Sequence, residues 1–163
     1  INVYSEPAKG TDFAFYVPAA DVGEELGEQT ERPQLPHGHG ELILVVDDEA
    51  SIREVTSATL QAFGYSVICA SDGTEAVALF AQRRNDIKVV VTDMMMPYMD
   101  GSATIRALRK LDPNLNIIAT SGLSGTAKAS EATEAGVKFF LPKPYTADKL
   151  LRMLADILAA KSK

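Results

Sequence analysis

The sequence predicts a doubly wound α/β domain, in which helices cover both faces of a parallel β-sheet. From Glu41 almost to the end of the chain, short apolar runs alternate five times with stretches whose apolar residues recur at helical spacing. The connections between these segments are short. Each crossover between parallel strands must be right-handed, and its helix covers one face of the sheet. The alternation therefore predicts five parallel strands and five helices.

The first predicted strand and helix carry the clearest signals. Residues 42–46 form a continuous run of Leu, Ile and Val, as expected for a strand that is buried on both faces of a parallel sheet. Apolar residues then recur at helical spacing from Ile52 to Phe63. Gly64 follows where the glycine that caps the C-terminus of a helix belongs. A second strand is predicted at 66–70.

The later elements continue this rhythm to the C-terminal region. In order, they are a helix capped by Asp72, a strand at 87–92, a helix around 105–111, a strand at 116–120, a helix at 126–135, a strand at 137–141 and a last helix capped by Thr146. Asp and Thr are suited to these caps because their side-chain oxygens accept hydrogen bonds from the first free backbone N–H groups of a helix. The predicted α/β domain therefore extends over 41–163.

The N-terminal 40 residues follow a different pattern. Residues 1–18 alternate apolar and polar side chains on both sides of a glycine-containing turn, which predicts a β-hairpin. Residues 19–40 contain glycines, prolines and an acidic run but few large apolar side chains, which is typical of a linker. An isolated hairpin has little to bury against, so we expect it to need a neighbouring sheet or chain.

Composition excludes several classes of function. The 163 residues carry a formal net charge of -6, without a basic surface that would favour nucleic acid or an anionic membrane. No apolar run is long enough to cross a bilayer, and the first residues lack the features of a leader peptide. The single cysteine, Cys69, lies in an apolar stretch and is expected to be a buried small hydrophobe. We expect a cytoplasmic segment of a longer protein.

Polar residues gather at the ends of the predicted strands. Asp47, Asp48 and Glu49 follow the first strand, Asp93 the third, Ser121 the fourth and Lys143 the fifth. In a doubly wound sheet, the reactive crevice lies beyond the carboxyl ends of the strands. Any one of these residues alone is more easily explained as a helix cap or a solvated charge. Their joint occurrence at four strand ends predicts a functional site.

The chemistry of this set points to a metal ion and to phosphoryl transfer. Three converging carboxylates repel one another unless a cation lies among them. Oxygen ligands without nearby His or Cys favour Mg²⁺, which also keeps waters that a phosphate can replace. An aspartate can form an acyl phosphate when metal, ammonium and hydroxyl groups neutralise the phosphoryl oxygens. Lys143 and Ser121 would supply the last two groups.

These segments together resemble the receiver domains of two-component response regulators. The matching segments are Leu44-Val45-Val46-Asp47-Asp48-Glu49, Thr92-Asp93-Met94-Met95-Met96-Pro97 with Asp100-Gly101, Ser121-Gly122, and Lys143-Pro144-Tyr145. The resemblance implies a flavodoxin-like sheet with strand order 2-1-3-4-5. It also implies that the domain accepts a phosphoryl group from phosphohistidine and relays it or changes conformation.

The resemblance assigns a role to each matching residue. Asp93 would be the phosphoacceptor, Asp48 a direct Mg²⁺ ligand and Asp47 a ligand that often acts through water. The backbone carbonyl of Met95 would complete the metal site, and Lys143 would pair with the phosphoryl group. Ser121 would bond the phosphoryl group after transfer, as the aromatic ring of Phe140 turns inward at the switch position. The resemblance further implies a cis peptide bond between Lys143 and Pro144.

Met95 and Leu123 bear on the lifetime of the acyl phosphate. They lie two residues after Asp93 and Ser121, at positions that resemble those from which family members orient the attacking water. Both side chains are apolar, so neither is suited to hold a water molecule. We therefore predict a comparatively long-lived acyl phosphate.

The N-terminal segment resembles the end of the ATP-binding domain of a histidine kinase. The resemblance lies in the Ser5-Glu6-Pro7 turn and in the Gly10-Thr11-Asp12-Phe13 strand within residues 1–18. The groups that bind ATP would lie upstream, so this fragment is expected to lack kinase activity. The parent protein would then be a hybrid histidine kinase, with a phosphohistidine domain and a histidine phosphotransfer protein as partners.

Two alternative functions remain open from the sequence. A metal-dependent aspartyl phosphatase also forms an acyl phosphate, but it requires an acid at the position of Met95. An interaction module without phosphorylation would not need the complete set of site residues. The family resemblance also suggests 126–158 as an output surface and leaves a homodimer open.

Overall fold

The chain divides into two compact units, with the division between Gln34 and Leu35. The structure is a computed structural model that describes residues 1–17, 34–122 and 125–160. In the first unit, β1 (Asn2–Glu6) and β2 (Gly10–Ala14) pair antiparallel, which confirms the predicted hairpin. Most of the predicted linker, residues 19–40, lies outside the described residues.

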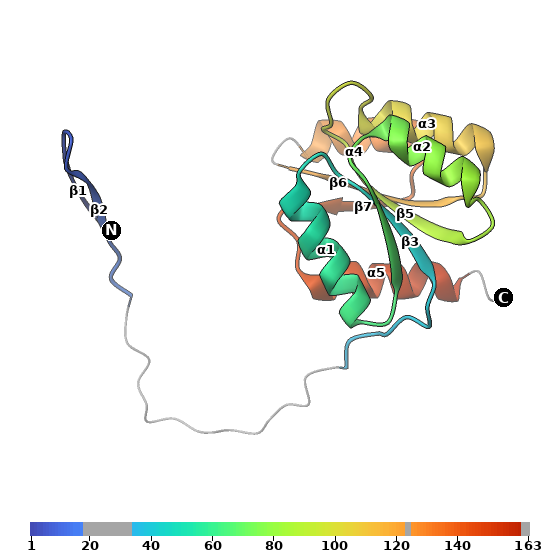
Figure 1. Ribbon diagram of the computed structural model, residues 1–163, viewed down its shortest axis with the longest axis horizontal. Helices are drawn as coiled ribbons and strands as arrows, with labels where there is room; N and C mark the ends of the chain where they lie inside the picture. Colours follow the sequence, from blue (N-terminus) through green and yellow to red (C-terminus); the bar gives the residue numbers. More distant parts are fainter. Residues whose placement is uncertain (18–33, 123–124, 161–163) are drawn as a thin grey trace. The chain divides into compact units, whose positions relative to one another are not determined.

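The second unit contains a five-stranded parallel sheet (Figure 1). Its strands are β3 (Leu42–Val46), β4 (Ser66–Ala70), β5 (Ile87–Asp93), β6 (Asn116–Ser121) and β7 (Phe139–Pro142). Their spatial order is β4-β3-β5-β6-β7, which is the predicted order 2-1-3-4-5 for this unit. The doubly wound fold is therefore confirmed.

Within the described residues of this unit, five helices cover both faces of the sheet; four of them connect successive strands, and the fifth follows the last strand (Figure 1). They are α1 (Ala50–Ala62), α2 (Gly73–Gln82), α3 (Gly101–Leu111), α4 (Gly125–Glu134) and α5 (Ala147–Ala159). Helices α1 and α5 lie on one face, and α2, α3 and α4 lie on the other. The predicted caps are present, because Asp72 accepts a hydrogen bond from Glu75 N at 2.9 Å and Thr146 accepts one from Lys149 N at 3.4 Å.

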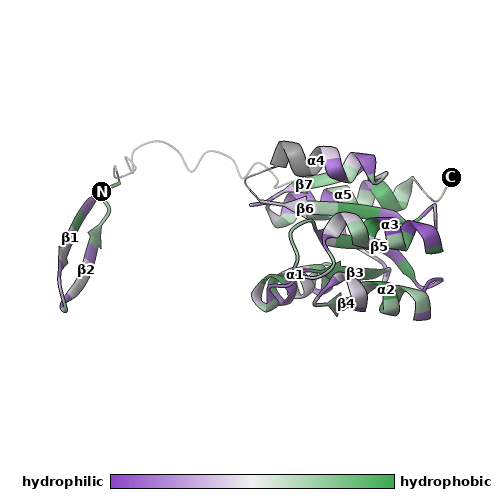
Figure 2. Ribbon diagram, turned by 90° about the horizontal axis from the view of Figure 1, so that it is seen from above, coloured by the Kyte–Doolittle hydropathy of each residue, from purple (hydrophilic) through white to green (hydrophobic). Residues whose placement is uncertain are grey.

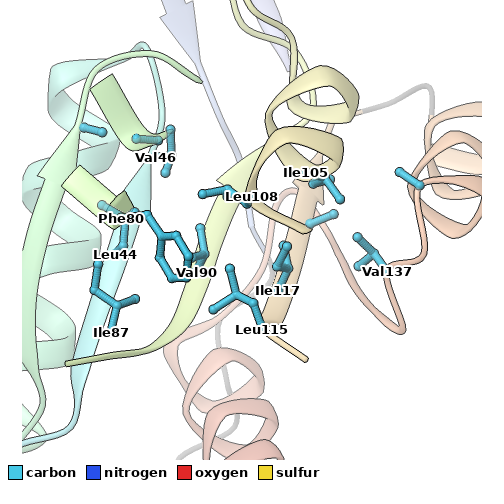
Figure 3. Packing of buried hydrophobic residues seen from close by; sticks show 14 of the residues in the cluster. Leu44, Val46, Phe80, Ile87, Val90, Ile105, Leu108, Leu115, Ile117 and Val137 are labelled. Atoms are coloured by element: carbon cyan, nitrogen blue, oxygen red, sulfur yellow. The ribbon is translucent and has the colours of Figure 1, made fainter. Parts of the chain in front are cut away.

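Two apolar cores hold the layers together. On one face, Phe80 of α2 and Leu108 of α3 pack against sheet residues that include Leu44 and Val90 (Figure 3). On the other face, Leu151 and its neighbours in α5 pack against the opposite side of the same strands. Figure 2 accordingly shows the central strands as mostly hydrophobic. Strands buried on both faces give a rigid base for the residues that follow them.

The fifth strand begins two residues later than predicted. The sequence pattern placed it at 137–141, whereas β7 is Phe139–Pro142. Gly136 has a φ of +87°, and the N–H of Val137 donates to the carbonyl of Ala132 at 2.9 Å. Val137 therefore belongs to the C-terminal cap of α4, where its apolar side chain is buried in the core.

Candidate phosphoryl-transfer site

The predicted site residues converge at the carboxyl edge of the sheet. Asp47 directly follows β3, Asp93 ends β5, Ser121 ends β6 and Lys143 directly follows β7. The strand register places Asp93 opposite Thr120, and Ser121 opposite Pro142. Since the strands are parallel, their side chains meet at one edge, as expected for this class of sheet.

Lys143 joins the two buried carboxylates of the site. Its Nζ lies 2.7 Å from Asp47 Oδ2 and 2.8 Å from Asp93 Oδ2. Burial opposes the charged form of Lys143, but the hydrogen bonds and negative charges of Asp47 and Asp93 outweigh it and raise the pKa of the ammonium. Because Asp47 and Asp93 are 3% and 7% exposed, this cation compensates charges that water reaches poorly.

The acidic cluster has the composition of a hard-metal site. One carboxylate oxygen from each of Asp47, Asp48 and Asp93 lies within 4.8 Å of the other two. Asp48 is exposed, whereas the other two aspartates are buried, so the cluster is open on one side. The oxygen donors and the open side fit Mg²⁺, which binds few carboxylates and retains waters.

Backbone N–H groups fix the orientation of the two buried carboxylates. The N–H of Glu49 donates to Asp47 Oδ1 at 3.0 Å, and the N–H of Met95 donates to Asp93 Oδ1 at 3.2 Å. Lys143 binds the other oxygen of each carboxylate, so both Asp side chains are held from two sides. Such preorganisation is what an efficient nucleophile or metal ligand requires.

Arg53 is a contact of this site that sequence reasoning missed. One of its terminal nitrogens, Nη1, donates to the carbonyl of Asp47 at 2.6 Å. Arg53 lies in the first turn of α1, six residues after Asp47, so its side chain reaches back to the acidic turn. A cation in the first turn of a helix that follows an acidic strand end is the signal that could have revealed this contact.

Ser121 and Phe140, the two residues of the predicted switch, differ in their degree of burial. Ser121 is 0% exposed, and its Oγ finds no hydrogen-bond partner among the described residues. Phe140 is partly buried and packs against the core on the face of α2, α3 and α4. A buried hydroxyl without a hydrogen-bond partner is energetically unfavourable, so Ser121 Oγ is an unusual polar group in this part of the structure.

Comparisons with known proteins identify the domain. The family described as the response regulator receiver domain matches residues 43–155. The chain belongs to this family. A receiver domain from Clostridium thermocellum shares its fold, with a TM-score of 0.71 and 33% identity over 74% of this chain and 96% of that one. Response regulator MprA of Mycobacterium sp. (strain KMS) is 38% identical over 120 residues.

The curated relatives are longer than this chain. The match to MprA covers 74% of this chain and 51% of that protein. Sensor kinase CckA of Brucella abortus is 32% identical over 162 aligned positions, and the match covers 94% of this chain and 17% of that protein. The family membership and these matches assign the receiver domain to two-component signalling as a phosphoreceiver. No helix in the described ranges is both long and apolar enough to span a membrane.

The remaining predictions for the receiver domain concern the Lys143–Pro144 peptide bond, Cys69 and Leu123; the position of Tyr145, from the same matching segment as Lys143, is given with them. The peptide bond between Lys143 and Pro144 is cis, as predicted, and the N–H of Lys143 donates to the carbonyl of Ser121 at 2.7 Å. Cys69 is partly buried, and burial raises the pKa of its thiol, which agrees with an unreactive packing role. Tyr145 packs against the core of α1 and α5. Leu123 lies outside the described residues.

Gly101 lets the receiver domain bring the start of α3 against the end of β5. A Cβ at this position would collide with the carbonyl oxygen of Asp93 and with the Cα of Met94. Both are backbone atoms, so the strand end itself would have to move. We expect Gly101→Ala to destabilise the fold by about 2 kcal/mol or more, as measured by urea unfolding.

Gly122 provides a matched control at the same edge of the sheet. No atom lies within 4 Å of the position where its Cβ would be, and its φ is not in the left-handed region. Gly122→Ala should therefore change the free energy of unfolding by less than about 0.5 kcal/mol. Equal effects of the two substitutions would contradict the close approach of α3 to Asp93.

Proposed function

We propose that the chain acts as a phosphorelay receiver in which the carboxylate of Asp93 accepts a phosphoryl group from phosphohistidine. The observation that carries this proposal is the position of Asp93, held by Lys143 Nζ at 2.8 Å and by the N–H of Met95 at 3.2 Å. A carboxylate oxygen attacks phosphorus, the P–N bond breaks, and its electron pair returns to the imidazole nitrogen, which takes up a proton. Lys143 balances charge on the phosphoryl oxygens.

Mg²⁺ is the cofactor that this arrangement would hold. Its ligands would be Asp47, Asp48, Asp93 and the backbone carbonyl of Met95, with Asp47 acting directly or through water. When bound, the ion neutralises charge on the transferred group. The support for this assignment is the oxygen-only cluster, whose three carboxylate atoms lie within 4.8 Å of one another.

Ser121 and Phe140 would report the phosphorylated state. The Oγ of Ser121, which is buried without a partner among the described residues, would donate to a phosphoryl oxygen. Movement of the Ser121 hydroxyl toward the phosphoryl group would leave space for the ring of Phe140, which is already partly buried against the core. Phe140 carries no hydroxyl, so this switch would depend on packing alone. The face over 126–158 would be the output surface, including any homodimer contact.

A hybrid histidine kinase is the setting that best explains the N-terminal unit. The match to sensor kinase CckA extends over 94% of this chain, more than the receiver domain alone. In the hairpin, Val3 pairs with Phe13 on one face, whereas Tyr4 pairs with Asp12 on the other. Residues 1–18 would close the sheet of an ATP-binding domain, with the apolar face buried against it.

The partners follow from this setting. A phosphohistidine domain would donate to Asp93, and a histidine phosphotransfer protein would receive the group. In this setting the fragment would lie in the cytoplasm, would make no membrane or nucleic-acid contact of its own and would have no kinase activity. The alternatives have less support: an aspartyl phosphatase lacks its second acid because Met95 occupies that position, and a module without phosphorylation does not explain the Lys143 contacts.

Chemical mapping of the phosphoryl group tests the proposed function directly. The protein is incubated with acetyl phosphate and Mg²⁺, reduced with borohydride and digested for tandem mass spectrometry. Reduction converts an aspartyl phosphate to homoserine, so the expected result is homoserine at residue 93 only when both reagents were present. Homoserine at Asp47 or Asp48, or none at residue 93, would reject the assignment.

The lifetime of the acyl phosphate is a second prediction of this function. The side chain of Met95 is 56% exposed beside Asp93 and is suited neither to accept a hydrogen bond from the attacking water nor to donate one to it. We expect phosphate loss with a half-life of minutes or longer, and a several-fold faster loss in Met95→Asn. The measurement is release of inorganic phosphate after removal of the donor.

Met95→Leu is the control for this comparison, because it changes the side chain but keeps it apolar. Its half-life should remain within about twofold of the original. A half-life of seconds in the original protein would show that another group positions the water. Equal rates of phosphate loss in Met95→Asn and Met95→Leu would likewise show that a group other than residue 95 positions the water.

A further inference from the structure

Tyr98 lies at the tip of the loop between β5 and α3 in a strained turn. Its φ is +66°, a region that bulky side chains rarely adopt. The N–H of Met99 donates to the carbonyl of Pro97 at 2.8 Å, so Tyr98 is the central residue of a γ-turn. With a positive φ this is the rare, strained form of the turn. The ring itself is fully exposed and gains nothing from burial within the domain.

The loop around Tyr98 is fixed at both ends. At its start, the N–H of Met95 donates to Asp93 Oδ1 at 3.2 Å. At its end, the N–H of Gly101 donates to the carbonyl of Met94 at 3.3 Å, and the N–H of Ala103 donates to Asp100 Oδ1 at 2.7 Å. Backbone strain persists only where the surrounding structure determines the conformation. The backbone of Tyr98 is therefore fixed in the loop that follows Asp93, and its ring is presented to solvent.

Exposed apolar side chains occur on two segments that follow strand ends at the carboxyl edge of the sheet, the loop after β5 and the helix after β3. Among the described residues of the receiver domain, the exposed large hydrophobic side chains are Val55, Met95 and Tyr98. Met95 contacts Asp93 through its backbone. Val55 lines a groove of about 420 Å³ that also contains Lys143 and Tyr145. The loop after Asp93 therefore carries two exposed apolar side chains, and the groove that contains Lys143 carries a third.

We propose that Tyr98 is an anchor residue for the phosphohistidine-bearing protein that exchanges a phosphoryl group with Asp93. This proposal rests on the proposed function. A protein donor must bring its imidazole within bonding distance of Asp93, so its surface also covers the loop five residues away. A small donor fills only the acidic pocket. A tyrosine ring on a fixed turn loses little entropy on binding, and tyrosine is among the residues that most often dominate interfaces.

Three substitutions separate the ring from the backbone. Tyr98→Gly removes the ring and relieves the strain, Tyr98→Asn removes the ring with a residue that tolerates positive φ, and Tyr98→Phe keeps the ring. The phosphoryl donors are acetyl phosphate and the autophosphorylated Brucella abortus sensor kinase CckA. We expect Gly and Asn to lower the rate constant for transfer from the kinase by about tenfold or more. Labelling by acetyl phosphate should stay within about twofold in all three variants.

Each outcome has a distinct meaning. The anchor is supported if Tyr98→Gly and Tyr98→Asn both lose transfer from the kinase, while Tyr98→Phe keeps it and all three variants keep labelling by acetyl phosphate. Loss in Gly alone would attribute the effect to loop flexibility and reject it. Transfer within twofold of the original in both variants, or no transfer from this kinase to the unsubstituted protein, would also reject it. Absence of acetyl phosphate labelling in the unsubstituted protein would instead reject the proposed function.

Discussion

Replacing Asp93 by asparagine is expected to lower Mg²⁺-dependent labelling by acetyl phosphate by about two orders of magnitude or more. The amide has nearly the same shape as the carboxylate, and its oxygen can still accept the hydrogen bond from Lys143 that the structure shows at 2.8 Å. It lacks the charge that makes the carboxylate oxygen a nucleophile. The reaction should therefore be lost while the fold is kept, as measured by incorporated phosphate and by thermal unfolding.

Asp86 offers a matched control just before the start of the same strand. It immediately precedes β5, which Asp93 ends, and its carboxylate forms an exposed ion pair with Arg83 at 3.2 Å. Asp86→Asn removes the same charge from the opposite edge of the sheet and should leave labelling unchanged. If Asp93→Asn were still labelled at the original level, the phosphoryl group would reside elsewhere and the assignment of Asp93 would be wrong.

The location of the site could be predicted because it depends on strand ends. Continuous apolar runs such as 42–46 and 87–92 mark strands buried on both faces, and both were observed within one residue. Once the strands are known to be parallel, the residues that follow them must share one edge. Asp47, Asp93, Ser121 and Lys143 are therefore brought together by topology, without any information on side-chain packing.

Contacts that depend on local backbone geometry were not predictable in this way. The hydrogen bond from Arg53 to the carbonyl of Asp47 depends on the backbone geometry of the turn between β3 and α1. The γ-turn at Tyr98 opposes the ordinary preference of a bulky residue, so propensity argues against it. Similarly, Val137 has the pattern of a strand residue, but Gly136 turns it into the cap of α4. At Arg53 and Tyr98 tertiary structure overrides the local sequence signal, whereas at Val137 the local cap signal of Gly136 prevails over the strand pattern.

Replacing Lys143 is expected to have the second large effect, because Lys143 is the cation that compensates two buried carboxylates. In Lys143→Met, the Asp47 and Asp93 side chains, which are 4% and 9% exposed, would lose their ion pairs at 2.7 and 2.8 Å. Leaving buried charges unpaired is costly, so we expect the free energy of unfolding in EDTA to fall by about 3 kcal/mol. Labelling by acetyl phosphate should also fall strongly, because the ammonium no longer faces the phosphoryl oxygens.

The same substitution should make the protein more dependent on Mg²⁺ for stability. In the original protein, Lys143 already neutralises part of the acidic cluster, so added Mg²⁺ competes with a resident charge. Without that charge, Mg²⁺ should stabilise Lys143→Met by more than it stabilises the original, in urea unfolding with and without the ion. Lys138→Met, which removes an exposed cation before β7, should behave like the original. Equal Mg²⁺ stabilisation of all three proteins would contradict a shared site for lysine and metal.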